Sequence, residues 1–201
     1  AANLMNAGSI SDRLFEACHT VVGRIRGGLA QVDVLVSVLF SSMSGSAVAD
    51  AAGPGLVTIR AMSNAGYPRG FAAAIVAASA TLGPIIPPSI PMIRYALIAN
   101  VSVAALFLAG VVPGLAMAVV MMLVVYATAV RRRFPLEAPV SGIERRRRLI
   151  RAVAPLGMPV VLLGGIYSGK FTPTESAAVA ALYALVLAGA VYRELNPTKL
   201  F

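Results

Sequence analysis

The stretch from Gly83 to Pro91 has the sequence GPIIPPSIP and decides how this chain folds. Four prolines within eight positions cannot form a regular helix, because proline lacks a backbone N–H and its ring collides with the preceding turn. An alanine-rich segment precedes the stretch, and apolar sequence resumes at Met92. We therefore predict that residues 68–100 form one membrane-spanning helix that is broken in its middle.

A second irregular stretch, SSMSGS from Ser41 to Ser46, precedes the first one. It joins two apolar arms, residues 32–40 and 47–59, and neither reaches the roughly 20 residues that a full membrane span needs. Arginines flank both arms, so both ends favour the same side of the membrane. Residues 27–64 thus predict a re-entrant helical hairpin, whose tip is tolerated at membrane depth only inside protein or beside a water-filled cavity.

The overall composition agrees with a membrane protein that lies in the lipid bilayer. Of 201 residues, 58% are hydrophobic and 12% are charged, whereas soluble domains average about 25% charged residues. The mean hydropathy is +0.82. The sequence predicts an all-α membrane protein.

The remaining segments are assigned from apolar length, charge and capping signals. We expect the end of a truncated helix (1–10), an amphipathic surface helix (11–26), a short helix plus a transmembrane helix (102–130), a basic cytoplasmic loop (131–151) and two transmembrane helices (152–169 and 172–192). Within the first pair, Pro113 is expected to start the transmembrane helix. The chain reads as a fragment, because its first residues already resemble the end of a helix.

The positive charge follows the rule for membrane topology. The net charge is +9, and eight of the seventeen lysines and arginines lie in residues 131–151. Placing that loop in the cytoplasm puts every arginine cluster on one side, as the positive-inside rule requires. No basic face with groove-reading or aromatic elements is evident, so nucleic-acid binding is not expected.

The two irregular stretches are the candidate functional site, because unwound elements at membrane depth are costly and mark functional positions. If both lie near the middle of the membrane, they meet. Unwound carbonyls and helix C-termini can coordinate sodium, and helix N-termini attract anionic groups. Four residues add hydroxyl oxygens: Ser44, Ser46, Thr81 and Ser89.

Three charged residues near these segments have competing interpretations. Asp50 faces the site, neutralises a nearby cation or stabilises the start of the second hairpin arm. Arg94 either binds a substrate carboxylate or extends its guanidinium toward the membrane surface. The sequence TPTE from Thr172 to Glu175 predicts a capping box, which we favour over a substrate role for Glu175.

Enzyme and nucleotide chemistry are not expected. A serine nucleophile near Ser44 would need a base, and the only histidine, His19, lies in the predicted surface helix. An intramembrane aspartyl protease needs two carboxylates, and Asp50 is the one good candidate. No phosphate-binding loop is evident, and no cofactor is predicted beyond Na⁺ as a coupling ion.

Several motifs together resemble the large membrane subunit of tripartite ATP-independent periplasmic (TRAP) transporters. They are SGSAVAD (44–50), AGY (65–67), RGFAAA (69–74), GPIIPPSIPM (83–92), FLAG (107–110), PG (113–114) and FTPTE (171–175). The likeness covers nearly the whole chain, and the ordered set is specific.

The resemblance implies a bacterial inner-membrane, multi-pass permease that imports organic acids, such as C4-dicarboxylates or sugar acids, together with sodium. It implies two protein partners, a small membrane subunit and a periplasmic substrate-binding protein. The implied fold is an elevator-type transporter with two inverted repeats, of which this N-terminal half supplies the first. Because alternating access needs both repeats around one site, this chain alone is not expected to transport.

The resemblance also assigns site residues. It places the first sodium site between the hairpin tip and the break, with Ser44, Gly45, Ser46 and Gly83 as Na⁺ ligands. The whole sodium and substrate site comprises Ser44, Gly45, Ser46, Asp50, Thr81, Gly83, Pro84, Pro87, Pro88 and Ser89, with Arg94 as a candidate substrate contact.

Three features depart from the family pattern: Arg60, Arg94 and the pair Gly53-Pro54 within the second hairpin arm. The alternatives are a sodium/carboxylate symporter that needs no binding protein, and a membrane fragment or scaffold without transport activity.

Overall fold

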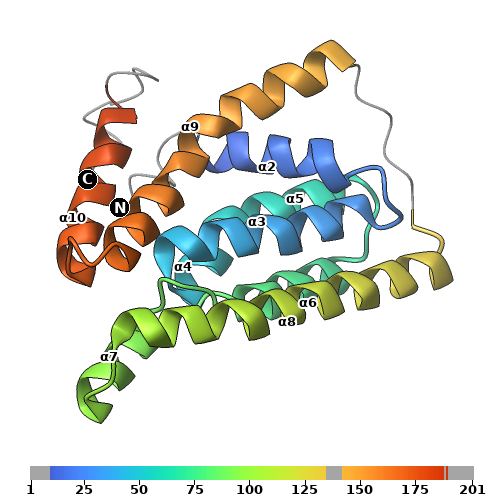
Figure 1. Ribbon diagram of the computed structural model, residues 1–201. Coiled ribbons are helices and arrows are strands. Elements are labelled where there is room, and N and C mark those ends of the chain that lie inside the picture. Colours follow the sequence, from blue (N-terminus) through green and yellow to red (C-terminus); the bar gives the residue numbers. More distant parts are fainter. Residues whose placement is uncertain (1–9, 135–141, 188, 190–201) are drawn as a thin grey trace.

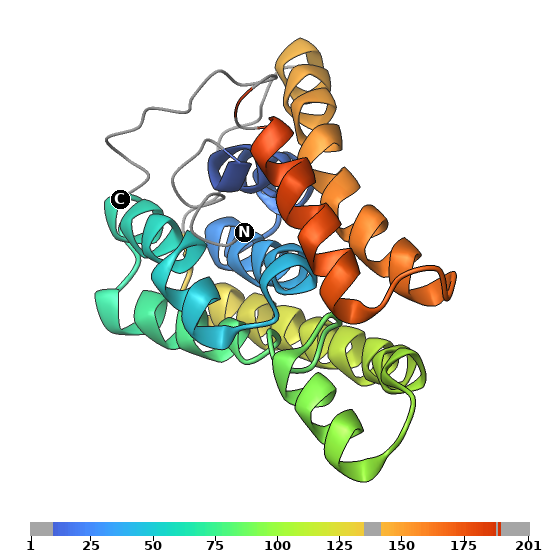
Figure 2. The ribbon, with the colours of Figure 1, turned by 90° about the vertical axis from the view of Figure 1, so that its left-hand side faces the viewer.

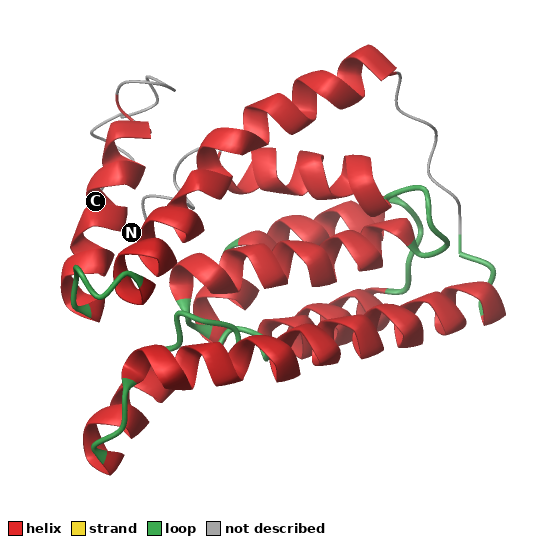
Figure 3. Cartoon of the chain, in the orientation of Figure 1, coloured by secondary structure: helices red, strands yellow, loops and turns green. Residues whose placement is uncertain are grey.

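The computed structural model describes residues 10–134, 142–187 and 189, and all regular elements in these ranges are helices (Figure 3). The all-α prediction is therefore confirmed for this part of the chain. The helices are α2 (Ile10–Val22), α3 (Gly28–Ser44), α4 (Ala47–Ala52), α5 (Pro54–Asn64), α6 (Arg69–Ala80), α7 (Ile90–Ala99), α8 (Val103–Arg131), α9 (Gly142–Tyr167) and α10 (Pro173–Val186).

Helix α3 lies at the centre of the bundle, and α4 and α5 return beside it to complete a helical hairpin (Figure 1). Helices α6 and α8 cover one side of this hairpin, while α2 and α9 cover the other, and α10 packs on α9 (Figures 1 and 2). Helix α3 is apolar around most of its circumference because it contacts helices on both sides. Its sequence is accordingly buried at most positions, including both faces of its first turns.

Two apolar cores hold the hairpin between its neighbours. One contains Phe40 of α3, Phe107 of α8 and Leu162 of α9, all buried. The other joins Val34 of α3 and Met62 of α5 to helices α6 and α8. One polar bond also links the hairpin to α8: the Gln31 side-chain amide donates to the Met122 carbonyl at 2.8 Å.

Helices α8 and α9 are long and apolar enough to cross a membrane. The core helix of a soluble protein would be mostly buried, but only 22% and 28% of their most apolar windows are buried in this structure. The outer face of α8 instead exposes a continuous set of large apolar side chains. They include Leu108, Val112, Leu115, Val119, Val120, Leu123 and Val124.

The arginine-bearing turns gather at one end of the bundle, on the right in Figure 1. Gly27 follows Arg24 and Arg26. It packs against Val125 and Ala129 near the C-terminus of α8. Tyr67, in the turn before α6, packs on Phe134 with ring centroids 4.6 Å apart. The hairpin tip and the turn after α9 lie toward the other end (Figure 1).

The predicted surface helix over 11–26 is shorter in the structure. Helix α2 ends at Val22, because Gly23 follows and the chain then turns through Gly27, which has a left-handed conformation with φ of 76°. Ile25, an apolar residue within the predicted helix, is consequently exposed. Residues 1–9, predicted as the end of a truncated helix, lie outside the described residues.

The prediction of two helices over 102–130 is wrong, since α8 is one helix of 29 residues with Pro113 inside it. Two glycines on either side of Pro113 face the broken segment. A side chain at Gly110 would meet the Ile85 carbonyl and Met92, and one at Gly114 would meet Ile86. These glycines allow α8 to approach the broken segment closely.

The basic loop expected over 131–151 is largely helical. Helix α9 begins at Gly142, so the run Arg145–Arg148 lies on its first turns and the helix expected over 152–169 starts earlier. Arginine is a good helix former, and Arg148 pairs with Glu144 one turn away at 3.2 Å. Residues 135–141, and part of the helix expected to reach 192, lie outside the described residues.

Candidate functional site

The hairpin tip consists of two non-helical residues whose conformations follow from their chemistry. Gly45 ends α3 with φ of 61°, and its N–H donates to the Ser41 carbonyl at 3.0 Å, the usual left-handed helix cap. Ser46 starts α4 as its N-cap, and its hydroxyl accepts from the Ala49 N–H at 3.4 Å. The Ser46 N–H donates to the Ser44 hydroxyl at 3.4 Å, so the two serines are held together at the tip.

The break between α6 and α7 is built in a similar way. Helix α6 ends at Ala80, and α7 begins after Ser89, which caps it by accepting from the Met92 N–H at 3.3 Å. The Ser89 hydroxyl also donates to the Pro84 carbonyl, which closes the irregular segment on itself. Ser89 is fully buried.

The tip and the break touch each other through their main chains. A Cβ added to Gly45 would collide with the Pro88 carbonyl oxygen. A Cβ added to Gly83 would lie 3.0 Å from the main-chain atoms of Ser46 and Ala47. The two segments that the sequence singled out are therefore in direct contact, and glycine is needed on both sides of it.

The contact lies within the length of the longest helix rather than at its end. Gly110 and Gly114 of α8 pack against Ile85 and Ile86 of the break. At 1.5 Å per residue these glycines are about 10 and 16 Å from the start of a helix roughly 40 Å long. An ion held at the tip would be well inside the thickness that α8 can span.

The candidate site residues do not all meet. Ser44, Gly45, Ser46, Gly83 and Pro88 lie at the tip–break contact. Ser44 and Pro88 also line a cavity of about 230 Å³ that is shared with α7, α9 and α10.

The other candidates are placed differently. Pro84 and Pro87 belong to the break, but Thr81 is exposed and its hydroxyl donates to the Ala78 carbonyl of its own helix at 2.6 Å. Arg94 is exposed on α7, one turn beyond the break. Asp50 is buried on α4.

The capping box that the sequence predicted is confirmed. The Glu175 carboxylate accepts from the Thr172 N–H at 2.8 Å, and the Thr172 hydroxyl accepts from the Glu175 N–H at 3.3 Å. This reciprocal pair fixes the start of α10.

A family model described as the DctM component of tripartite ATP-independent periplasmic transporters matches residues 1–201. The chain belongs to this family.

Curated TRAP permeases are similar over nearly the whole chain. The sialic acid TRAP transporter large permease protein SiaM of Vibrio cholerae is 44% identical over 194 residues, covering 96% of this chain and 45% of that protein. The C4-dicarboxylate large permease protein DctM of Pseudomonas aeruginosa is 45% identical over 192 residues, with coverages of 96% and 45%. The 2,3-diketo-L-gulonate large permease protein YiaN of Escherichia coli is 40% identical over 196 residues, with coverages of 98% and 46%. This TRAP permease chain thus spans under half the length of these relatives.

Sequence reasoning missed one buried charge in this TRAP permease chain. Asp33 lies inside the first hairpin arm, which was treated as apolar, and it is 2% exposed. The signal was available, since an ionisable residue within a membrane segment is itself a functional candidate. Asp50 is therefore not the one buried carboxylate of the hairpin, as the sequence analysis expected, because Asp33 is a second one. The relatives reported above are named as transporter permeases.

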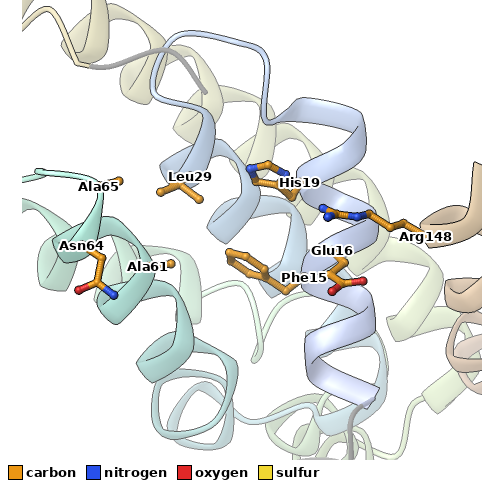
Figure 4. A pocket seen from close by; sticks show the side chains of 8 residues that line it. All are labelled: Phe15, Glu16, His19, Leu29, Ala61, Asn64, Ala65 and Arg148. Atoms are coloured by element: carbon orange, nitrogen blue, oxygen red, sulfur yellow. The ribbon is translucent and has the colours of Figure 1, made fainter. Parts of the chain in front are cut away.

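A larger cavity lies away from the tip–break contact. It has a volume of about 410 Å³ and lies between α2, α5 and α9, close to the turn at Asn64 and Ala65 (Figure 4). In Figure 4, Arg148 reaches from α9 over α2, beside Glu16 and His19. This cavity belongs to the arginine-bearing end of the bundle, so we do not include it in the candidate site.

Proposed function

We propose that this chain is the first repeat of the large permease subunit of a sodium-coupled TRAP transporter, a multi-pass protein of the bacterial inner membrane that imports organic acids. Its partners would be a small membrane subunit and a periplasmic binding protein that delivers the substrate. The observation that carries the proposal is the contact of the Gly45 tip with the Pro88 carbonyl. This contact brings together the end of α3, the start of α4 and the unwound main chain between α6 and α7.

This geometry suits a sodium ion. The C-terminus of α3 and the unwound segment between α6 and α7 offer main-chain carbonyls, and Ser44 and Ser46 add hydroxyl oxygens. Hard cations prefer such all-oxygen sets, and discontinuous membrane helices commonly supply them. Ser44, Gly45, Ser46 and Gly83 are the proposed first shell around Na⁺.

Three relatives and one structural feature support a carboxylic-acid substrate. The names of three relatives refer to sialic acid, C4-dicarboxylate and 2,3-diketo-L-gulonate, all of which are acids or their anions. The start of α7 places the Ile90 N–H beside the tip, and the N-terminus of a helix is favourable for a carboxylate. Arg94 on the same helix is a candidate second contact for such a group.

The test uses the full-length permease with its neighbouring subunits in proteoliposomes. Uptake of labelled carboxylic acids is measured with and without an inward sodium gradient, and the binding protein is added separately. Uptake that requires both sodium and the binding protein supports the proposal.

Sodium-driven uptake without the binding protein would instead identify a binding-protein-independent symporter. Absence of uptake for a panel of acids, with correctly inserted protein, would favour a scaffold without transport activity.

A further inference from the structure

A second group of buried polar side chains lies inside the hairpin, beyond the tip–break contact. Asp33 of α3 and Asp50 of α4 are each 2% exposed. Burying a carboxylate is costly unless a cation or several hydrogen bonds compensate its charge. The surroundings of the two carboxyls therefore indicate what balances them.

Hydroxyl groups surround the two carboxyls. The Ser79 hydroxyl of α6 donates to Asp33 Oδ2 at 2.6 Å. The Thr58 hydroxyl of α5 also acts on the Asp33 carboxyl, and it donates its proton to the Pro54 carbonyl at 3.0 Å, which leaves its oxygen lone pairs for a cation. Ser37, one turn after Asp33 on α3, hydrogen-bonds Asp50. Ser79, Thr58 and Ser37 are all buried.

Among the described residues, no positive side chain acts on either of the two carboxyls. Asp33 and Asp50 are close enough to repel each other, and the other groups that act on Asp33 are the two hydroxyls. Within the described residues, Asp50 Oδ2 is a buried oxygen without a hydrogen-bond partner. The site thus holds two acidic groups and an open oxygen, and lacks a counter-charge from the described part of the chain.

The broken second arm of the hairpin leaves one main-chain oxygen without its helical partner. Helix α4 ends at Ala52 and α5 begins at Pro54, after Gly53. Because Pro54 has no N–H, the Asp50 carbonyl four residues earlier loses its usual helical partner. Gly55 lies next to this oxygen, since a Cβ added to Gly55 would lie 3.1 Å from it.

We propose that Asp33 and Asp50 bind a sodium ion inside the hairpin, with the Thr58 and Ser79 hydroxyls as further oxygen ligands. Carboxylate, hydroxyl and carbonyl oxygens are the ligands that hard cations prefer. The described residues contain no cluster of three or more His, Cys, Asp or Glu side chains, which a transition-metal site would favour. This site is separate from the proposed site at the tip and does not depend on it.

A sodium ion at this place would account for the pair Gly53-Pro54, which departs from the family pattern in the second hairpin arm. An unbroken second arm would use the Asp50 carbonyl in its own helix, whereas the break leaves it available for a cation. A bound ion would also tie α4 and α5 to α3 and α6. Cation binding here would therefore order the arm that carries Ser46, four residues before Asp50.

The test counts sodium ions bound to the full-length permease complex reconstituted in nanodiscs. Equilibrium binding of ²²Na⁺ is measured for the unmodified protein, for Asp33→Asn and for the matched control Asp12→Asn, which changes an exposed aspartate on α2. We expect Asp33→Asn to remove one bound Na⁺ or weaken its affinity by about ten-fold or more. Asp12→Asn should bind sodium as the unmodified protein does.

Two further variants keep the outcome decisive. Ser79→Ala tests the site without changing charge, and it should weaken the same Na⁺ if Asp33→Asn fails to fold, as judged by size-exclusion chromatography. Ser44→Leu should remove a different Na⁺, and if it does not, the proposed tip site fails while the hairpin site stands. Unchanged sodium number and affinity in folded Asp33→Asn, including the case in which the two carboxyls share only a proton, would overturn the proposal.

Discussion

Gly45 at the hairpin tip packs directly against the carbonyl oxygen of Pro88 in the broken helix. The contact joins residues 43 positions apart in the sequence and involves main chain on both sides. Because no side chain intervenes, the tip cannot accept even a methyl group without moving away from the break. The proposed sodium site therefore requires a residue without a side chain at position 45.

Replacing Gly45 with alanine should separate the tip from the break and abolish sodium-driven uptake. The variant carries two costs, the strain of φ at 61° and the collision with Pro88. Gly66→Ala is the matched control, because Gly66 has φ of 85° but has nothing within 4 Å of an added Cβ. Both variants bear a left-handed strain of about 1 kcal/mol, so an equal loss of uptake in the two would contradict the role of the contact.

The serine hydroxyls at the tip should contribute to sodium affinity. We expect Ser44→Ala to weaken the sodium dependence of uptake by about ten-fold, as the loss of a cation ligand or its support typically does. Ser42→Ala makes the same chemical change two residues earlier, where the hydroxyl donates to the Leu39 carbonyl of its own helix at 2.6 Å. Sodium titrations of uptake that shift equally for both variants would exclude Ser44 as a ligand.

The hairpin and the break could be predicted because proline, glycine and serine impose local backbone geometry. Pro84, Pro87 and Pro88 disrupt a helix locally, and the structure has none from Thr81 to Ser89. Pro91 lies in the first turn of α7, where proline is tolerated. The capping box at Thr172 is equally local. Such features need no knowledge of distant contacts.

The errors arose where tertiary packing decides. Gly110, Pro113 and Gly114 signal a turn in isolation, yet α8 continues because the glycines admit the neighbouring break and a helix tolerates one internal proline when its surroundings compensate. The groups around Asp33 could not be predicted either, since Ser79 and Thr58 are far away in the sequence. Spacing along the chain carries no trace of these contacts.

Helix α8 should lose its close contact with the break when Gly110 is enlarged. In Gly110→Ala the added methyl would lie 2.8 Å from the Ile85 carbonyl oxygen and 2.6 Å from the Met92 side chain. We expect a lower melting temperature and reduced uptake, because overpacking a core typically lowers the free energy of unfolding by about 2 kcal/mol. Gly164→Ala on α9 meets nothing within 4 Å and should be neutral or stabilising, since alanine is the better helix former by about 1 kcal/mol. Equal melting temperatures for the two variants would show that α8 does not need this contact.

Glu175 should act through the capping box and not through the substrate. Its carboxylate accepts from the Thr172 N–H and hydroxyl, both at 2.8 Å. Glutamine at this position keeps an oxygen acceptor without the charge, so Glu175→Gln should preserve uptake and its substrate affinity. Thr172→Ala removes the hydroxyl that accepts from the Glu175 N–H, and it should destabilise the start of α10 by about 1 kcal/mol, the typical cost of losing an N-cap side chain. Thermal melting of the detergent-solubilised permease and uptake kinetics test both variants together. A raised KM in Glu175→Gln at unchanged melting temperature would assign the charge to substrate binding and reject the capping role.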